Sequence, residues 1–557
     1  MIVDYLQGSA AAGLDADICI IGAGAAGIAM ARAFIGSSLQ VCLLESGGLA
    51  GEPQSQALCQ GHSVGSLPLD PGTSRMRVFG GSCNLWGGGC MTLDALDLRP
   101  RDWVAHSGWP IEPAELERYY LAARAICGLQ AHSIEGNGFG TLPERAPLPF
   151  KSGVLTNQIF MRTPLLFGRD YLTDLGRAPN ITVLLHANLL ELDISPDGRA
   201  VQGARIGSLG GHRARVRARH YVLACGGIEN ARLLLLSDSL VPGGPGNAHG
   251  LVGRYFMDHP SGKLGAVVAG ASDDLVRPYD RERAQGTAAF PEICLSEEAQ
   301  RTHRLLNGRI HPFAVEGPVP RGLRALRGLR KARRPAASDE GSRLEADLCT
   351  AMRNGALPEA KAATGSTASL MLQLGLGAGD VARALVRKRA GKPAVRTSHV
   401  DLVGYFEQEP NPDSRITLGD ERDVLGQRKV CVDWRLTALD RHTYRTAARL
   451  FGNELAQACG GRFEPTPWVE ADDGAPPQVQ GTAHHMGTTR MADDPCQGVV
   501  DRHCRVHGMD NLHIAGSSVF PTGGWAFPTF TIVALSLRLA DRLQTLCAEP
   551  ALAALST

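Results

Sequence analysis

Hydrophobic residues near the start of the chain predict a strand, a helix and a second strand in close succession. Ile18 to Ile21 is an uninterrupted apolar run, as expected for a strand buried on both faces. Ile28 to Phe34 is small and apolar at helical spacing, and Leu39 to Leu44 is a second apolar run. The pattern therefore predicts a β-α-β unit with parallel strands.

The turn of this unit reads Gly22-x-Gly24-x-x-Gly27, and the second strand ends at Glu45. Gly22 permits the tight turn, Gly24 permits close approach of a pyrophosphate, and Gly27 permits the helix to pack on the strand. The helix N-terminus offers N–H groups to phosphates, and Glu45 can accept hydrogen bonds from ribose hydroxyls. The unit predicts binding of an adenine dinucleotide, either NAD or FAD.

A second strand–glycine–helix unit follows later in the chain. His220 to Ala224 is predicted as a strand, Cys225 to Arg232 contains two glycines, and a leucine-rich stretch comes next. We expect this unit to return to the same parallel sheet. Further elements are predicted as strands at 180–185 and 189–194, as a turn and then a strand within 411–418 whose partner strand is 430–436, and as helices at 114–129 and 440–457.

Arg321 to Arg334 is a basic segment with leucines at helical spacing. Such a helix can lie on a membrane, but it is more often a solvated helix or a lid. Pro335 to Gly341 looks like a flexible link.

Composition argues against several classes of function. A net charge of +1 over 557 residues gives no electrostatic basis for binding nucleic acid. The 14 cysteines include no C-x-x-C pair, so we expect no metal site and no disulfide framework. The stretch from Met1 to Leu14 lacks the features of a signal peptide, and no apolar run is long enough to span a membrane. The expectation is a soluble cytoplasmic enzyme.

Two further stretches carry candidate chemistry. Arg75 to Gly89 places many glycines around Trp86, which suits backbone passing close to a flat ligand. Near the C-terminus, His484 and His485 stand before Met486-Gly-Thr, and adjacent histidines are candidates for acid–base work near neutral pH. Taken alone, a histidine pair is more often structural.

These motifs together resemble the glucose–methanol–choline (GMC) oxidoreductases, a flavoprotein family. The match rests on the N-terminal glycine motif, Gly80-Gly-Ser-Cys-Asn-Leu-Trp86, Ala224-Cys-Gly-Gly227, Gly253 to Pro260, His484-His-Met-Gly-Thr488 and the closing Phe527-Pro-Thr-Phe-Thr531. The resemblance spans nearly the whole chain in the family's order. It implies FAD, an α/β fold with a Rossmann-like FAD-binding domain on a parallel sheet, and an α+β substrate domain with a mostly antiparallel sheet.

The resemblance also implies a domain plan and a set of site residues. The FAD domain comprises 15–100, 181–260 and 481–545; residues 101–180 form a mixed lid and substrate-domain segment, and 261–480 form the substrate domain with a basic insertion near 321–345. His484 matches the family's general base, which accepts the proton of a substrate hydroxyl while hydride passes to FAD. The partners implied are a small hydroxyl-bearing substrate and an electron acceptor, either O2 or another. The residues expected to bind the cofactor are Gly22, Gly24, Gly27, Glu45, Gly80, Gly81, Ser82, Asn84, Trp86, Gly87, Leu189, Ala224, Gly516, Phe527, Pro528 and Thr529.

Two positions depart from the family pattern. Covalent members carry a histidine just before the tryptophan of the glycine-rich loop, whereas this chain has Leu85, which implies non-covalent FAD. The family usually places His or Asn before the final Pro-Thr, whereas this chain has Phe527. Loss of a preorganised hydrogen-bond partner typically costs about 10²–10³ in rate. Either another group substitutes, with His485 the nearest, or the substrate is bulky and apolar, or the reaction is not alcohol oxidation.

The leading hypothesis is an FAD-dependent oxidase or dehydrogenase acting on a primary or secondary alcohol. Trp525 and Phe527 are expected to line the substrate pocket, with plain core packing as the alternative. One rival is a GMC-fold flavoprotein with a non-standard reaction, such as a lyase or decarboxylase, which Phe527 favours. A second is a catalytically idle FAD-binding protein that acts through Arg321–Arg334 on a partner or membrane.

Overall fold

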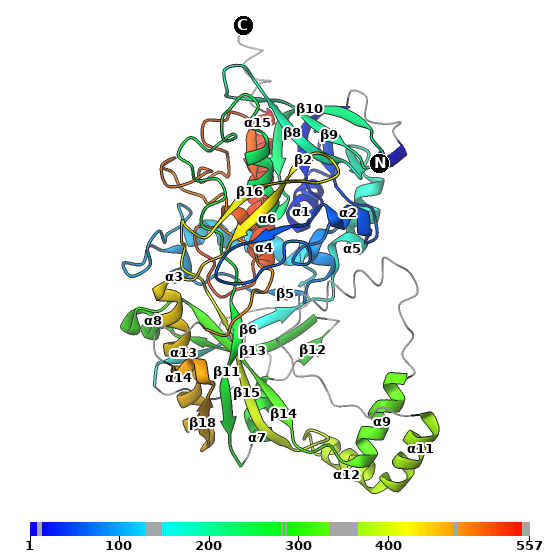
Figure 1. Cartoon of the computed structure of the whole chain (residues 1–557), viewed down its shortest axis with the longest axis vertical. Helices are drawn as coiled ribbons and strands as arrows, with labels where there is room; N and C mark the ends of the chain where they lie inside the picture. The colour runs from blue at the N-terminus through cyan, green and yellow to red at the C-terminus, as the bar shows by residue number, and fades with distance from the viewer. Residues whose placement is uncertain are drawn as a thin grey trace.

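The computed structural model describes residues 1–7, 14–129, 148, 150, 152–270, 272–279, 282–284, 287–332, 366–471 and 477–548. Figure 1 shows two bodies stacked along the long axis, with a group of helices projecting from the lower one. The predicted link at 335–341 and the last two residues of the basic segment lie outside the described residues.

The upper body is built on a mixed sheet. In spatial order its strands are β1 (Ile2–Asp4), β7 (Ile181–Leu185), β3 (Val41–Leu44), β2 (Leu14–Ile21), β10 (Arg213–Leu223), β9 (Val201–Gly207) and β8 (Asn188–Ile194), and β19 (Leu512–Ile514) also pairs with β10. The strands from β1 to β10 pair in parallel, as does β19. The return of β10 to β2 agrees with the sequence prediction, whereas β8 and β9 form an antiparallel extension.

The centre of this body consists of short buried strands and a helix made mostly of small residues. Residues Ile18 to Ile21 of β2 and all four residues of β3 are buried, as the uninterrupted apolar runs predicted. Helix α1 (Ala25–Ala33) joins them, and it packs with α15 (Thr529–Ala548), which in turn packs with α4 (Pro113–Ile126). The first and last parts of the chain thus share one core.

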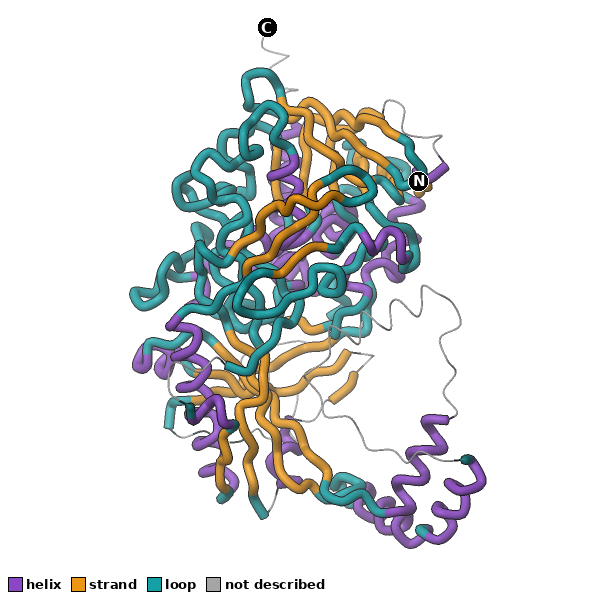
Figure 2. The backbone as a smooth tube through the Cα atoms, in the orientation of Figure 1, coloured by secondary structure: helices purple, strands orange, loops and turns teal. Residues whose placement is uncertain are grey.

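The lower body is built on a second sheet (Figure 2), whose neighbouring strands pair in antiparallel fashion. Its order is β18 (Arg462–Pro465), β11 (Ser261–Val268), β15 (Thr397–Phe406), β14 (Gly308–Glu316), β13 (Thr287–Leu295), β6 (Leu155–Arg162) and β5 (Gly89–Cys90), with β12 (Glu282–Ala284) beside β13. Helix α13 (Ala438–Cys459) packs along β11 and β18 and helps to bury a separate core. A mixed α/β fold with a parallel and an antiparallel sheet is therefore confirmed.

A small third sheet and several helices complete the described structure. The sheet runs β16 (Arg415–Arg422), β17 (Arg428–Asp433) and β4 (Gly61–Ser63). The other α-helices are α2 (Pro53–Ala57), α3 (Ala95–Leu98), α5 (Phe167–Arg177), α6 (Gly226–Leu236), α7 (Ser272–Val276), α8 (Glu297–His303), α9 (Arg321–Ala332), α11 (Thr367–Leu376), α12 (Ala378–Arg389) and α14 (Pro467–Glu470).

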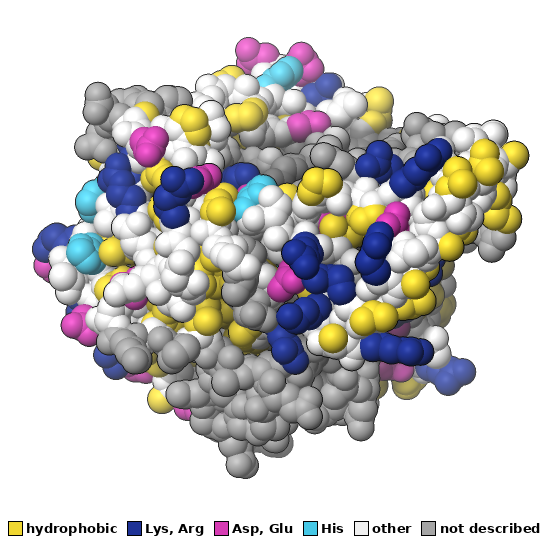
Figure 3. Space-filling model, turned by 90° about the horizontal axis from the view of Figure 1, so that it is seen from below, with side chains coloured by type: hydrophobic (Ala, Val, Ile, Leu, Met, Phe, Trp, Pro, Cys, Tyr) yellow, Lys and Arg dark blue, Asp and Glu magenta, His cyan; other side chains and the backbone are white. Residues whose placement is uncertain are grey.

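The basic segment forms α9, which packs with α11 and α12 away from the sheet (Figure 1). Leu323 is buried against Ala384 and Val395, so part of the apolar side of α9 is used within this helical group. Figure 3 shows Lys and Arg side chains interspersed with hydrophobic ones on the face seen from below. Within the described residues, no helix has the length and apolar character needed to cross a bilayer.

Candidate active site

A cavity of about 670 Å³ lies at the carboxyl ends of the parallel strands. Its wall includes residues that follow β2, β3, β10 and β19, namely Gly22, Glu45, Ala224 and Gly516. The opposite wall comes from the antiparallel sheet. Carboxyl ends of parallel strands are where α/β folds bind ligands, and the volume is typical of a small-molecule site.

Bare glycine backbone forms one side of the cavity. A Cβ added at Gly24, Gly226 or Gly516 would meet no other atom within 4 Å, and all three residues line the cavity. Gly24 is the N-cap of α1 and has no side-chain cap, so the N–H groups of the first helical turn are not capped by a side chain. Such a cradle fits a dinucleotide pyrophosphate.

Gly27 acts differently and does not line the cavity. A Cβ at this position would lie 1.9 Å from the carbonyl oxygen of Gly22, so only glycine lets α1 pack this closely. Glu45 lines the cavity while its carboxylate accepts hydrogen bonds from the backbone N–H groups of Ala23 and Gly47, at 3.0 and 2.9 Å. The acid therefore also braces the glycine turn.

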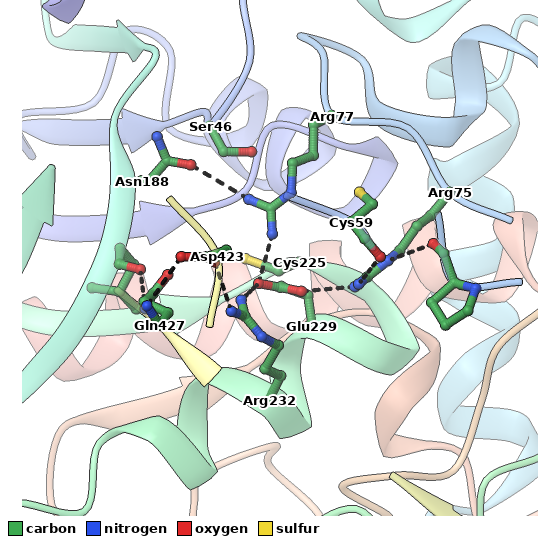
Figure 4. A network of polar contacts seen from close by, with 12 residues as sticks. Ser46, Cys59, Arg75, Arg77, Asn188, Cys225, Glu229, Arg232, Asp423 and Gln427 are labelled. Atoms are coloured by element: carbon green, nitrogen blue, oxygen red, sulfur yellow. Dashed lines mark hydrogen bonds and ion pairs between the residues drawn. The ribbon is translucent and has the colours of Figure 1, made fainter. Parts of the chain in front are cut away.

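Three arginines converge on Glu229 beside this cradle (Figure 4). Arg75, Arg77 and Arg232 each donate to its carboxylate, at 2.7, 2.8 and 2.8 Å. Burial acts to raise the pKa of Glu229, but the arginines outweigh it and hold the pKa well below the ordinary value. Arg75 and Arg77 line the cavity, so the network fixes the glycine-rich loop to α6 and adds positive charge.

The glycine-rich loop divides into lining and bracing residues. Gly81, Ser82, Trp86 and Gly87 line the cavity, as do Leu189, Pro528 and Thr529. Asn84 instead holds the loop, since it donates to the carbonyl of Phe79 at 2.8 Å and accepts from the N–H of Gly168 at 3.1 Å. Gly80 has a φ of 101° and leaves no room for a Cβ beside Asn84 and Gly168.

His484 faces the cavity with one ring nitrogen already engaged. Its Nδ1 lies 2.7 Å from Oγ1 of Thr482 and 3.2 Å from Nδ1 of His259. Burial lowers the pKa of His484 well below the ordinary histidine value, and the neighbouring His259 adds to this. With Nδ1 turned to Thr482, the neutral ring has Nε2 left for a substrate.

Asp258 holds the backbone that carries His484. Its carboxylate accepts hydrogen bonds from the N–H groups of His259, Ala483 and His484, at 2.7, 3.1 and 2.8 Å. Ala483 has a φ of 60°, a left-handed conformation that this carboxylate helps to hold. Sequence reasoning gave Asp258, His259 and Thr482 no role in the site.

His485 has different surroundings. Its ring packs against Phe256 at a centroid distance of 5.7 Å, and Nε2 has no hydrogen-bond partner among the described residues. Burial, together with the charge of Arg75, lowers the pKa of His485 to about 3. The main chain of His485 lies against Gly227, where an added Cβ would approach its carbonyl oxygen to 2.3 Å.

Phe527 occupies the wall beside His484, with 4.7 Å between the two ring centroids. Trp525, expected beside it, is fully buried outside the cavity wall, and its Nε1 donates to Asp94 at 3.0 Å. It packs with Phe160 and Cys294, so the structure places it in the core behind the wall.

Sequence reasoning missed the wall contributed by the antiparallel sheet. This wall includes Phe160, Arg162, Glu292, Arg309, His311, Phe313 and Tyr405. The available signal was the alternation of Arg309, His311 and Phe313, which places all three on one face of β14. No cluster of three or more His, Cys, Asp or Glu side chains suited to a metal ion occurs in the described part of the chain.

Comparison with known proteins agrees with the fold. Residues 410–536 match the family model described as GMC oxidoreductase. The chain is 25% identical to 6'''-hydroxyparomomycin C oxidase of Streptomyces lividus and to paromamine 6'-oxidase of Streptomyces fradiae, over 94% of this chain and 90% of each relative. Among solved structures, a formate oxidase superimposes with a TM-score of 0.56 at 16% identity, over 96% of this chain and 99% of that one.

Proposed function

Since the chain belongs to the GMC oxidoreductases, we propose that it is an FAD-dependent enzyme that oxidises a primary or secondary alcohol to a carbonyl. The observation that carries this proposal is the geometry of His484. Its Nδ1 is engaged by Thr482, its ring is buried and neutral, and it lies on the wall of the cavity that contains the dinucleotide cradle.

In this mechanism His484 removes the proton of the substrate hydroxyl. A neutral Nε2 is the acceptor, and Thr482 and Asp258 hold the ring and its backbone in place. Proton transfer to a positioned base contributes about 10²–10⁴-fold. When bound, FAD supplies the acceptor for the hydride that leaves the substrate carbon.

The residues present fit FAD, and we propose that it binds without a covalent bond. The cradle of Gly24, Gly226 and Gly516 leaves room beside bare backbone, and Arg75 and Arg77 bring positive charge. Leu85 lines the cavity at the position where covalent family members carry histidine. Burial raises the pKa of the nearby Cys83 thiol to about 12, so this thiol is a poor nucleophile.

His484, rather than His485, is the proposed base. The ring of His485 packs on Phe256, whereas the hydrogen bonds from Thr482 and Asp258 hold His484. Any second polar partner for the substrate has to come from elsewhere in the wall, because Phe527 has no hydrogen-bonding group.

The test is the visible spectrum of the purified, FAD-loaded protein mixed without air with a panel of alcohols and sugars. Bleaching of the oxidised flavin band by one class of hydroxyl compound is the expected result. If dithionite bleaches the band and no hydroxyl compound does, the proposal fails, and a non-oxidative reaction becomes the favoured hypothesis. Denaturation with acid tests the second point, because a non-covalent flavin appears in the supernatant.

A further inference from the structure

A charged group lies in the cavity wall opposite the dinucleotide cradle. Glu292 on β13, and Arg309 and His311 on β14, line the same cavity as His484. Arg309 and Glu292 are both only 3% exposed at the side chain and form an ion pair at 3.1 Å. Buried ion pairs are weak contributors to stability, so this one calls for a functional explanation.

Among the described residues, Glu292 has hydrogen-bonding or ionic partners at one of its two carboxylate oxygens. Oε1 lies 3.1 Å from Arg309 and 3.2 Å from Nδ1 of His311. Oε2 is buried and has no hydrogen-bond partner among the residues that the structure describes. Burial acts to raise the pKa of Glu292, but Arg309 and His311 outweigh it and hold the pKa below the ordinary value, so the carboxylate is ionised. A buried charged oxygen without a donor is costly, and a ligand donor would offset this cost.

Aromatic rings fix the position of Arg309. Its guanidinium carbon lies 4.1 Å from the ring centroid of Tyr405, 4.8 Å from that of Phe527 and 5.2 Å from that of Phe160. The register of β14 on β15 places Arg309 directly opposite Tyr405. This rigid surround keeps Glu292 and its free oxygen in one orientation.

Phe527 contacts both this group and the proposed base. Its ring centroid lies 4.8 Å from the guanidinium carbon of Arg309 and 4.7 Å from the ring centroid of His484. The charged group and the proposed base therefore border the same side chain in the wall of one cavity.

We propose that Glu292, held by Arg309, is a substrate-binding residue that selects polyhydroxylated substrates by accepting a hydrogen bond from a second hydroxyl. The inference rests on the proposed function, because the first hydroxyl is the one that His484 deprotonates. A simple alcohol has no second donor and leaves Oε2 unpaired. A carboxylate substrate would meet the negative charge of Glu292. This assigns the site to sugars and polyols and excludes the bulky apolar substrate that Phe527 alone suggested.

Two probes of similar size test the selection in the wild-type enzyme. Methyl glucopyranoside and cyclohexylmethanol both carry a CH2OH group on a six-membered ring, but only the first has ring hydroxyls. The FAD-loaded enzyme is expected to give a kcat/KM at least about 10-fold higher for the glycoside, or for its galacto isomer, because a hydrogen bond to a charged group is gained. Equal or better use of cyclohexylmethanol overturns the selection. Failure of every hydroxyl compound to bleach the flavin overturns the proposed oxidation instead.

Variants then test the residue. Glu292→Gln should lower the ratio of kcat/KM for glycoside to that for cyclohexylmethanol about 10- to 100-fold, mainly through the KM for the glycoside. Because Glu292→Gln leaves Arg309 without its counter-charge, the double variant Glu292→Gln with Arg309→Met provides a neutral replacement of the pair. It should show the same loss of preference.

Asp401→Asn is the matched control. Asp401 lies on the neighbouring strand β15, pairs with Lys263 at 2.7 Å, and is not among the residues that line the cavity. The control should keep the wild-type ratio. An unchanged ratio in both Glu292 variants, or an equal fall in the control, overturns the proposal.

Discussion

Arg101 and Glu407 form a bidentate ion pair with N–O distances of 2.8 and 2.6 Å, and neither side chain is exposed. Arg101 follows α3, whereas Glu407 follows β15 of the antiparallel sheet. Arg101→Met should lower the free energy of unfolding by about 3–5 kcal/mol, because Glu407 remains as a buried, unpaired charge. The double variant Arg101→Met with Glu407→Gln should recover much of this loss.

Urea denaturation of the single and double variants measures the coupling. The exposed pair Arg199–Asp510 provides the control, since its side chains are 66% and 55% exposed. Arg199→Met should have little effect on unfolding, because solvent screens an exposed ion pair. A double variant as unstable as the sum of its single variants would contradict the expected coupling.

Gly24 and Gly27 belong to one motif, but alanine substitutions at the two positions should have different effects. Gly24 has a φ of −81°, which alanine adopts without strain, and an added Cβ would point into the cavity. Gly24→Ala should therefore preserve the melting temperature of the apoprotein and lower the flavin content of the purified protein. Gly27→Ala should destabilise the apoprotein by about 1–3 kcal/mol or more, because the Cβ meets the carbonyl oxygen of Gly22.

Absorbance at the flavin band and thermal unfolding of the apoprotein separate the two effects. The prediction is contradicted if Gly24→Ala lowers the melting temperature as much as Gly27→Ala does.

Substitution of His484 should affect the rate of flavin reduction far more than substitution of His485. His484→Gln should slow flavin reduction by about 10²–10⁴-fold, because the proton acceptor is lost. His485→Gln leaves the contacts of His484 with Thr482 intact and should cost much less. Burial lowers the pKa of His484 well below its ordinary value, so the neutral base persists and wild-type kcat/KM should not fall until the pH is well below 6.5.

Stopped-flow reduction across pH checks this expectation. A wild-type acid limb centred near pH 6.5 would be inconsistent with the burial of His484, and equal losses in the two variants would argue against its role as the base.

Buried neutral histidines should make the protein sensitive to acid. Burial, the largest cause, lowers the pKa of His513 to about 3 and that of His259 to about 4. Below a pH of about 6.5 the unfolded chain protonates these rings while the native protein does not, so unfolding takes up protons. Stability should therefore fall as the pH drops from about 6.5 toward 4, by roughly 1.4 kcal/mol per pH unit for each such ring.

His513→Leu should make stability depend less steeply on pH, because it removes one of these rings. The substitution breaks no hydrogen bond, since neither ring nitrogen of His513 has a partner among the described residues. Thermal unfolding between pH 7 and pH 4.5 measures the slope. His303 is exposed, so His303→Ala should retain the wild-type slope. If His513→Leu also showed the wild-type slope, burial of a neutral His513 would not explain the acid sensitivity.

The glycine-lined end of the cavity was predictable because it depends on local sequence. Gly22, Gly24 and Glu45 lie within one β-α-β unit, where turn geometry, strand burial and chain order all constrain the residues. The same holds for the strand–glycine–helix unit at Ala224, whose return to the sheet the structure confirms. No pattern in the sequence predicted that β8 and β9 would extend this sheet in antiparallel fashion.

The wall of the cavity formed by the antiparallel sheet was less predictable because it depends on long-range register. Glu292, Arg309, Tyr405 and Phe527 meet only when β13, β14 and β15 are aligned and the segment before α15 packs against them. Single charged residues in short strands carry no local sign of their partner on another strand. Trp525 shows a related limit, since it lies two residues before Phe527 and packs in the same small cluster, yet it is buried behind the cavity wall that Phe527 lines.

The pairing of β10 with both β2 and β19 has a consequence for biosynthesis. On the ribosome, residues 14–44 emerge first, yet β19 and the α15 helix that covers α1 emerge only after residue 512. The nascent chain therefore carries an incomplete apolar sheet through most of its synthesis, and such surface is what chaperones bind. A premature stop codon before residue 512 should accordingly abolish flavin loading as completely as a lesion in the N-terminal glycine motif.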